Sequence, residues 1–246
     1  KIKLNNNDLK GVIFDLGYSI NQIKNSKKGL SFNDKGILNM KMGLNDFSAN
    51  DVVSKMDEKK LAKVFKAFGD ERYSRRIAKE IIKKRKDKNI KTEDLVHIID
   101  SVKKYKNTKI HNSTKVFQAL RILVNEEISE LINGLVKSFN LIPVGSIIAV
   151  VTFHSIEDKI VKFFFTNFSS NKSKTSRYYP ENNNKKTLFE TYKNKIIKPT
   201  DQEVKENNPS RSAKLRYAVR SKDNFVYPVD LEKRFFNYLE LERTIV

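Results

Sequence analysis

The 246-residue sequence contains no cysteine. This absence excludes disulfide bridges, zinc–thiolate sites and a cysteine nucleophile. Only three histidines are present, and because His97, His111 and His154 lie far apart in the sequence, no metal site is expected. No apolar run approaches the ~18 residues of a membrane span, and no charged-then-apolar signal segment opens the chain. A cytoplasmic protein without membrane contact is therefore expected.

Basic residues, by contrast, are abundant. The chain has 49 Lys and Arg against 29 Asp and Glu, a formal net charge of +20. Such an excess favours a polyanionic partner, most simply a nucleic acid. The bias toward Lys, Asn and Ile is also what an AT-rich genome imposes, so part of the charge need not be functional. Apolar residues make up 39% of the chain, enough to bury a core.

Three short segments have the character of β-strands. Residues 11–16, "GVIFDL", form an apolar run that ends in an acid. Residues 146–153 form an unbroken apolar run too short for a helix, which is typical of a central strand of a parallel sheet, covered on both faces. Residues 213–220 alternate apolar and polar side chains, as a later strand would.

Most of the remaining sequence has helical periodicity. Residues 48–105 are predicted to be helical, with Ser48 and Thr92 as N-caps. Within them, residues 70–88 form a helix with a dense basic face. Residues 114–139 are predicted to be one long helix, because their apolar positions recur at three- and four-residue spacing. Two polar stretches are predicted to be loops, residues 17–46 and 169–210.

This order of elements predicts an α/β fold. The strands form an open sheet, and a helical domain is inserted after the first strand. The expected limits are residues 1–46 and 106–246 for the domain that holds the sheet, and 47–105 for the inserted helical domain.

Polar side chains follow two of the predicted strands. Asp15 ends the first, and His154 follows the second. Open α/β sheets bind ligands beyond the carboxyl ends of their strands, and both ends should point to the same side of the sheet. Asp15 either caps the turn before Gly17 or meets amines and hydroxyls of a ligand.

The sequence "HSIED" at 154–158 also has the composition of a helix start. Ser155 is the expected N-cap, with Asp158 at the third helical position and Glu157 favoured by the helix dipole. His154 is harder to explain by packing, since a hydrophobic residue is the default after an apolar strand. A capping role and a ligand-binding role can coexist here.

Seven sequence blocks together resemble one family. The resemblance spans about Gly11 to Arg220 and points to the bacterial 16S ribosomal RNA cytosine-N(4) methyltransferases, known as RsmH or MraW. The blocks are "FDLGYSINQ" (14–22), "GLSF" (29–32), "LNMKM" (38–42), "FGDERYSRRIAKEI" (68–81), "STKVFQALRILVNEE" (113–127), "VTFHSIEDKIVKFF" (151–164) and "NPSRSAKLR" (208–216).

The resemblance implies a class I, Rossmann-like methyltransferase sheet with an inserted all-helical domain that uses S-adenosyl-L-methionine. It implies methylation of the exocyclic amine of a decoding-site cytidine in 16S rRNA of the small ribosomal subunit. The family's cofactor-contacting acid and glutamine match Asp15 and Gln22. Asp15 and His154 are the catalytic candidates, since either could accept hydrogens of the amine, and His154 could also stack on the base.

The chain also departs from the family pattern. The family's glycine-rich cofactor loop and its ribose-binding acid lie upstream of the "DLG" strand, and none of the eight glycines here forms a G-x-G. The first strands and this half of the cofactor site are therefore expected to be absent from this chain, which alone is expected to be inactive. Asn39 stands where the family usually has Asp, and "DLGYSIN" where it has "DLGVSSP".

Contacts to RNA are expected from the helical insert and from the late loop, where cations can neutralise phosphates without reading sequence. The candidates are Arg72, Arg75, Arg76, Lys83, Lys84, Arg85, Arg211 and Arg216. The partner would be 16S rRNA within the small subunit, and a homodimer is left open. Two alternatives are a non-catalytic RNA-binding or ribosome-assembly protein and a methyltransferase that acts on another nucleic acid.

Overall fold

A computed structural model shows two compact units. One comprises Lys1–Gly17 and Glu130–Phe236, and the other Tyr18–Ser129 and Asn237–Val246. These limits differ from those expected for the two domains, 1–46 with 106–246 and 47–105. The structure describes residues 9–24, 28–33, 36–43, 45–85, 90–103, 111–170 and 187–244.

The first unit contains a three-stranded sheet in the order β1-β2-β3. Its strands are β1 (Gly11–Asp15), β2 (Ile147–Thr152) and β3 (Lys214–Val219), which confirms the three predicted strands. β1 runs parallel to β2, and β3 runs antiparallel to it. The fold is therefore α/β with a small mixed sheet.

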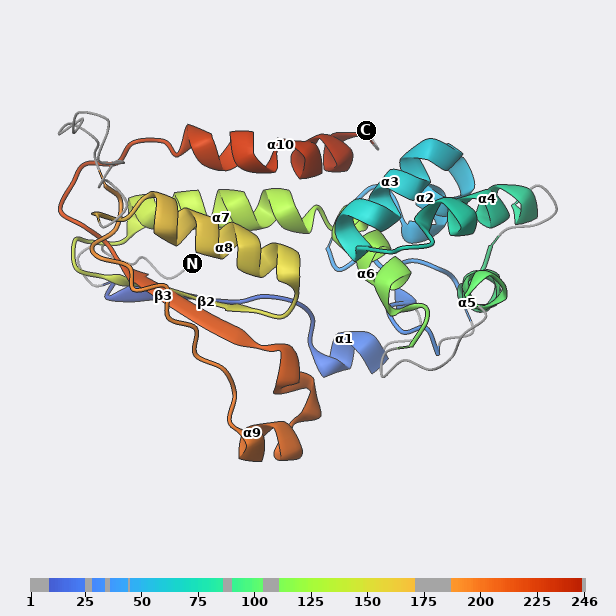
Figure 1. The fold of residues 1–246 in the computed structure, drawn as a ribbon, viewed down its shortest axis with the longest axis horizontal. Helices are drawn as coiled ribbons and strands as arrows, with labels where there is room; N and C mark the ends of the chain where they lie inside the picture. Colours follow the sequence, from blue (N-terminus) through green and yellow to red (C-terminus); the bar gives the residue numbers. More distant parts are fainter. Residues whose placement is uncertain are drawn as a thin grey trace. The chain divides into compact units, whose positions relative to one another are not determined.

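Helices cover one face of this sheet. Figure 1 shows α7 (Glu127–Leu141) and α8 (Ser155–Asn167) on the same side of the strands. On that face Ile148 and Val150 of β2 are fully buried. On the opposite face Ile13 is 77% exposed, with Ile147 and Tyr217 about half exposed. The composition of β2 had predicted a strand covered on both faces. In the described residues only one face is covered by helices, so that prediction is wrong.

Arg216 corrects one of the expected RNA contacts. It lies on the helix-covered face of β3 and is only 2% exposed. Its Nε donates to Asp158 Oδ1 at 2.7 Å, and its Nη1 donates to Tyr192 Oη at 3.0 Å and to Asn194 Oδ1 at 2.9 Å. Burial raises the pKa of Asp158, but hydrogen bonds from Arg216 and Lys214 outweigh it and hold that pKa below its usual range. Arg216 therefore joins α8 to β3 and is not available to a phosphate.

The second unit is helical. Its helices are α1 (Ile20–Lys24), α2 (Ala49–Lys55), α3 (Glu58–Gly69), α4 (Ser74–Lys84), α5 (Thr92–Val102) and α6 (Thr114–Val124). α3 and α6 approach so closely that a Cβ on Gly69 would overlap the carbonyl oxygen of Lys115. The buried faces of the helices supply the core, including Leu61, Phe65, Phe68, Ile77, Leu95 and Leu120.

The helix starts in this unit agree only partly with the sequence. Ser48 is the N-cap of α2, as predicted, and exchanges hydrogen bonds with Asp51. Thr92 is not an N-cap, because it is the first residue of α5 and is fully buried. The N-cap of α5 is Lys91, whose N–H donates to Asp94 at 3.0 Å.

The predicted helix 114–139 is two helices, α6 and α7. Between them Glu126 adopts a positive φ of 48°, which interrupts the helical backbone. Asn125 fixes this junction: it donates to the carbonyl of Met40 at 2.9 Å and accepts from the N–H of Met42 at 2.8 Å. A tertiary contact of this kind leaves no trace in the apolar periodicity.

Residues beyond β2 hold further structure that the sequence did not predict. The expected loop 169–210 contains α9 (Asp201–Glu206) and most of the 3-10 helix Asn208–Ser212. A last helix, α10, spans Val229–Arg243, with non-helical backbone angles at Phe235. None of the helices in the described ranges is long and apolar enough to cross a membrane.

Glu242 of α10 caps the start of α7 within the second unit. Its carboxylate, 1% exposed, accepts hydrogen bonds from the N–H groups of Ile128 and Ser129 at 2.9 Å each, and from the Ser129 hydroxyl. These N–H groups have no intrahelical acceptor, because they lie in the first turn. Burial raises the pKa of Glu242 to about 7, and the nearby charge of Glu126 adds to the rise.

The buried pair of Asp158 and Arg216 generates a stability prediction. Arg216→Met leaves the Asp158 carboxylate without its main partner, and we expect the free energy of unfolding to fall by about 3–5 kcal/mol. Urea unfolding followed by circular dichroism measures this loss. Lys66→Met, which removes an exposed pair with Asp70, is the matched control and should change stability by about 0–1 kcal/mol. Equal losses in the two variants would contradict a structural role for the buried pair.

Glu242 generates a prediction on pH. Its pKa is higher in the folded chain than in the unfolded one. Its contribution to the free energy of unfolding is therefore fully present below about pH 4.5, and it is lost as the pH rises to about 7. We expect the melting temperature to fall between pH 5 and pH 8, and to fall less in Glu242→Gln. Scanning calorimetry at several pH values tests this. The exposed Glu240→Gln should keep the wild-type slope; the same slope in all three proteins would refute the assignment.

Candidate functional site

The carboxyl end of β1 presents an acid to solvent. Asp15 is exposed, and its carboxylate makes no hydrogen bond to any residue in the described ranges. The next N–H, that of Leu16, donates to Val151 of β2 at 3.1 Å and so extends the pairing of the two strands. Gly17 then turns the chain with a φ of +102°, a conformation that favours glycine. Asp15 is therefore held by rigid backbone while its side chain stays available.

The carboxyl end of β2 passes directly into α8 through a tight cap. Glu157, which is buried, accepts hydrogen bonds from the N–H groups of Phe153 at 2.8 Å and His154 at 3.2 Å. In return, the N–H of Glu157 points at Nδ1 of His154, at 3.5 Å. The N-cap of α8 is thus His154 and not Ser155, as the sequence had suggested. The reason is that Glu157, at the third helical position, reaches back to close a capping box.

The side chains of His154, Glu157 and Asp158 all make contacts within the fold. The His154 ring is 9% exposed and lies against Glu157, with Nε2 and Oε1 3.0 Å apart. Asp158 does not cap the helix; it turns toward β3 and pairs with Arg216 and Lys214. The catalytic role of His154 therefore stays a prediction, and the contacts observed for it hold the strand-to-helix turn.

The structure brings two of the predicted site residues to neighbouring positions. Asp15 ends β1 and His154 follows the end of β2, and these strands are parallel partners in one unit. Their carboxyl ends therefore meet at one edge of the sheet, where open α/β folds bind ligands.

Gln22 belongs to the other unit, although it follows Asp15 by seven residues. It lies in α1, where its Oε1 accepts from the N–H of Ser19 at 2.8 Å. Its own N–H points at the Ser19 hydroxyl at 3.3 Å. This reciprocal pair orients the Gln22 side chain at the helix start, and its Nε2 group is the part that can donate to a ligand.

The expected RNA-contacting cations divide into two groups. Arg85 donates to the carbonyls of Val53 at 3.1 Å and Met56 at 2.6 Å, so it closes the carboxyl end of α2 rather than facing solvent. Arg211 is exposed next to Asn208. Five others are exposed along α4 and the turn before it: Arg72, Arg75, Arg76, Lys83 and Lys84.

Two residues, one on α4 and one on α8, were not singled out as functional from the sequence. Lys79 is exposed on α4 at helical spacing from Arg72, Arg75, Arg76 and Lys83, and periodicity could have identified it. We call these five residues the basic face. Glu157 was noticed only for its charge, although its position three residues after His154 is the spacing of a capping box.

Comparisons with known proteins give a consistent result. A model of the MraW methylase family matches residues 2–221. The ribosomal RNA small subunit methyltransferase H of Xanthobacter autotrophicus is 40% identical over 214 residues, which cover 87% of this chain and 62% of that protein. The protein of the same name from Ruegeria sp. is 38% identical over 239 residues, or 96% of this chain and 72% of the relative. That from Bartonella henselae is 42% identical over 213 residues, or 85% and 61%.

The chain thus spans 62% of the length of the Xanthobacter relative and 61% of the Bartonella henselae one. The match runs from before β1 to just beyond β3, and it includes Asp15, Gln22 and the strand-to-helix turn at His154. With its family model covering most of its residues, this chain belongs to the MraW methylase family.

Proposed function

We propose that this chain forms part of an S-adenosyl-L-methionine-dependent methyltransferase of the small ribosomal subunit. Its target would be the exocyclic amine of a decoding-site cytidine in 16S rRNA. The observation that carries this proposal is the family match over residues 2–221, together with relatives of about 40% identity that are named for methylation of small-subunit rRNA. A ribosomal substrate also implies that the protein works in the cytoplasm.

The same match supports a finer fold assignment. We infer that β1, β2 and β3 are the later strands of a class I methyltransferase sheet, and that the helical unit is an insertion after β1. The parallel pairing of β1 with β2 supports this reading.

Asp15 and Gln22 are the residues of this chain that would hold the cofactor. The fit rests on their chemistry: Asp15 offers an exposed carboxylate with no hydrogen bond to described residues, and Gln22 offers an oriented amide. A carboxylate accepts hydrogen bonds from amine and hydroxyl groups, both of which the cofactor carries. When bound, S-adenosyl-L-methionine would supply a methyl group already activated by a positively charged sulfur, which would remain on the cofactor as a neutral thioether.

The chain's own contribution to this chemistry is to position acceptors. The amine of cytosine is a weak nucleophile because its lone pair is delocalised into the ring. Acceptors that draw its hydrogens out of the ring plane localise that lone pair, and one amine proton must leave after transfer. Asp15 is the candidate acceptor, since it is exposed at the carboxyl edge of the sheet. His154, held against Glu157, positions the neighbouring turn.

The basic face supports an RNA substrate. Its five cations lie on one side of a single helical segment, where they can follow a phosphate backbone. The target base must also leave its stack to be methylated. Arg216 and Arg85 take no part in this surface, because their guanidinium groups bond within the fold.

The test is methyl transfer by the chain in its natural full-length context. Tritiated S-adenosyl-L-methionine and small subunits that lack the modification are incubated, and the RNA is digested to nucleosides. We expect label in N(4)-methylcytidine, and a loss of about 10²–10³-fold in rate for Asp15→Ala, because a preorganised acceptor is removed. Asp230→Ala, an exposed acid of the same unit, is the matched control and should retain the wild-type rate.

The alternatives give other outcomes. Label in tRNA or DNA, but not in small subunits, would favour a methyltransferase with another nucleic acid substrate. A folded protein that binds RNA but neither binds the cofactor nor transfers label would favour a non-catalytic RNA-binding or ribosome-assembly protein.

A further inference from the structure

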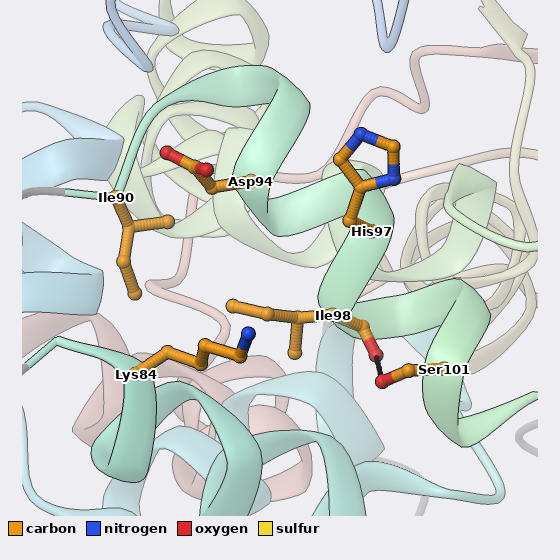
Figure 2. Close-up of a pocket in the computed structure, with 6 residues that line it drawn as sticks. All are labelled: Lys84, Ile90, Asp94, His97, Ile98 and Ser101. Carbon is orange, nitrogen blue, oxygen red and sulfur yellow. Dashed lines mark hydrogen bonds between the residues drawn. The ribbon is translucent and has the colours of Figure 1, made fainter.

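A cavity lies between α4 and α5, within the helical unit. Its volume is about 320 Å³. Six residues line it, and Figure 2 shows Lys84 entering from α4 while the others come from α5 and the residue before its cap: Ile90, Asp94, His97, Ile98 and Ser101. None of them was assigned to the methyl-transfer site.

The walls of this cavity combine three kinds of chemistry. Ile90 and Ile98 form an apolar surface and are themselves almost fully buried. The exposed imidazole of His97 gives one side a flat ring that can stack. Lys84 contributes a cation, and the Ser101 hydroxyl donates to the carbonyl of Ile98 at 2.8 Å, which leaves its oxygen as an acceptor.

Asp94 adds an acceptor whose position is fixed. Its Oδ2 accepts from the N–H of Lys91 at 3.0 Å, which ties the carboxylate to the start of α5. An ionised carboxylate has about four lone-pair sites, so it can accept several hydrogen bonds at once. The cavity therefore pairs a fixed acceptor with apolar and aromatic walls, a combination suited to a nucleobase and not to a bare anion.

The cavity also adjoins the basic face. Successive residues of an α-helix are rotated by about 100°, so Lys83 points outward with the basic face while Lys84 turns toward α5. A strand that follows the basic face by its phosphates would pass Lys84 next. Its base could then enter between the two helices, while its phosphate stays near Lys84.

We propose that the cavity between α4 and α5 binds one unstacked nucleotide of single-stranded RNA. The base packs on Ile90 and Ile98 with its face toward His97, its polar edge meets Asp94 or Ser101, and Lys84 neutralises the phosphate. The size agrees, since about 320 Å³ lies in the range of small-ligand sites. The identity of the ligand as RNA rests on the proposed function. The residues that line the cavity do not include Asp15 or Gln22, so the cavity is a separate binding site.

Histidine resonances give a direct test. The chain has only three histidines, so the imidazole Hε1 signals in proton NMR can be assigned with single His→Gln variants. Titration with cytidine 5′-monophosphate should shift the His97 signal saturably and leave that of His111 in place. Inorganic phosphate is the matched probe, and it should shift His97 much less.

Two variants on the same helix sharpen this test. Lys84→Ala should weaken cytidine monophosphate binding by about tenfold, whereas Lys79→Ala, on the basic face, should leave it unchanged. The absence of a saturable His97 shift, or an equal shift with phosphate alone, would overturn the proposal. The titration needs neither cofactor nor methyl transfer, so its failure is distinguishable from failure of the proposed function.

A second experiment uses RNA itself at one fixed salt concentration. His97→Ala removes the stacking ring and should lower the affinity for a single-stranded oligonucleotide by about 5–10-fold, with the affinity for an RNA duplex unchanged. Lys79→Ala should lower both affinities alike, because phosphate contacts do not distinguish paired from unpaired strands. Equal effects of His97→Ala on single-stranded and duplex RNA would refute a nucleotide site in this cavity.

Discussion

The buried ion pair between Asp158 and Arg216 is the interaction on which the carboxyl end of the sheet depends. α8 begins directly after β2, so anchoring its first turn to β3 fixes the path by which the chain leaves the sheet. Because β2 is also the partner of β1, the same anchor determines what lies beside Asp15. A buried guanidinium is costly unless its donors find acceptors, and Tyr192 and Asn194 accept hydrogen bonds from its Nη1. Removing Arg216 would thus disturb the turn beside Asp15, although Arg216 does not lie at the carboxyl ends of β1 and β2.

The polar residues of this region can be sorted by whether the fold already uses them. Glu157 closes a cap, Asp158 binds Arg216, and Arg85 closes the end of a helix; all three are engaged within the chain. Asp15 has an exposed carboxylate that bonds to no residue in the described ranges. This difference separates Asp15 from its neighbours better than residue type does, and the proposed ligand role rests on it.

The sequence was informative where local patterns decide the structure. Two apolar runs and one alternating segment located the three strands, and Ser48 was correctly identified as a cap, because those features depend on a few adjacent residues. Tertiary contacts decided the rest. Arg216 was expected to contact RNA, yet a partner on α8 draws it inward. The break at Glu126 depends on Asn125 reaching the loop at Met40, and α10 has too mixed a surface for a clear period. The position of Asp15 at the end of a strand could be inferred from the sequence, whereas the cavity beside His97 could not, because its walls come from two helices.

Glu242 has a consequence for the order in which the chain is made. Synthesis proceeds from the amino end, and the N–H groups of Ile128 and Ser129 emerge more than a hundred residues before the carboxylate that caps them. Until residue 242 has left the ribosome, the start of α7 must be satisfied by water, and the helical unit remains without its last segment. β1 precedes the helical unit in the sequence, and β2 and β3 lie between Ser129 and Glu242, so all three strands are synthesised before the helical unit is complete. The helical unit can therefore complete its folding only after residue 242 has been synthesised.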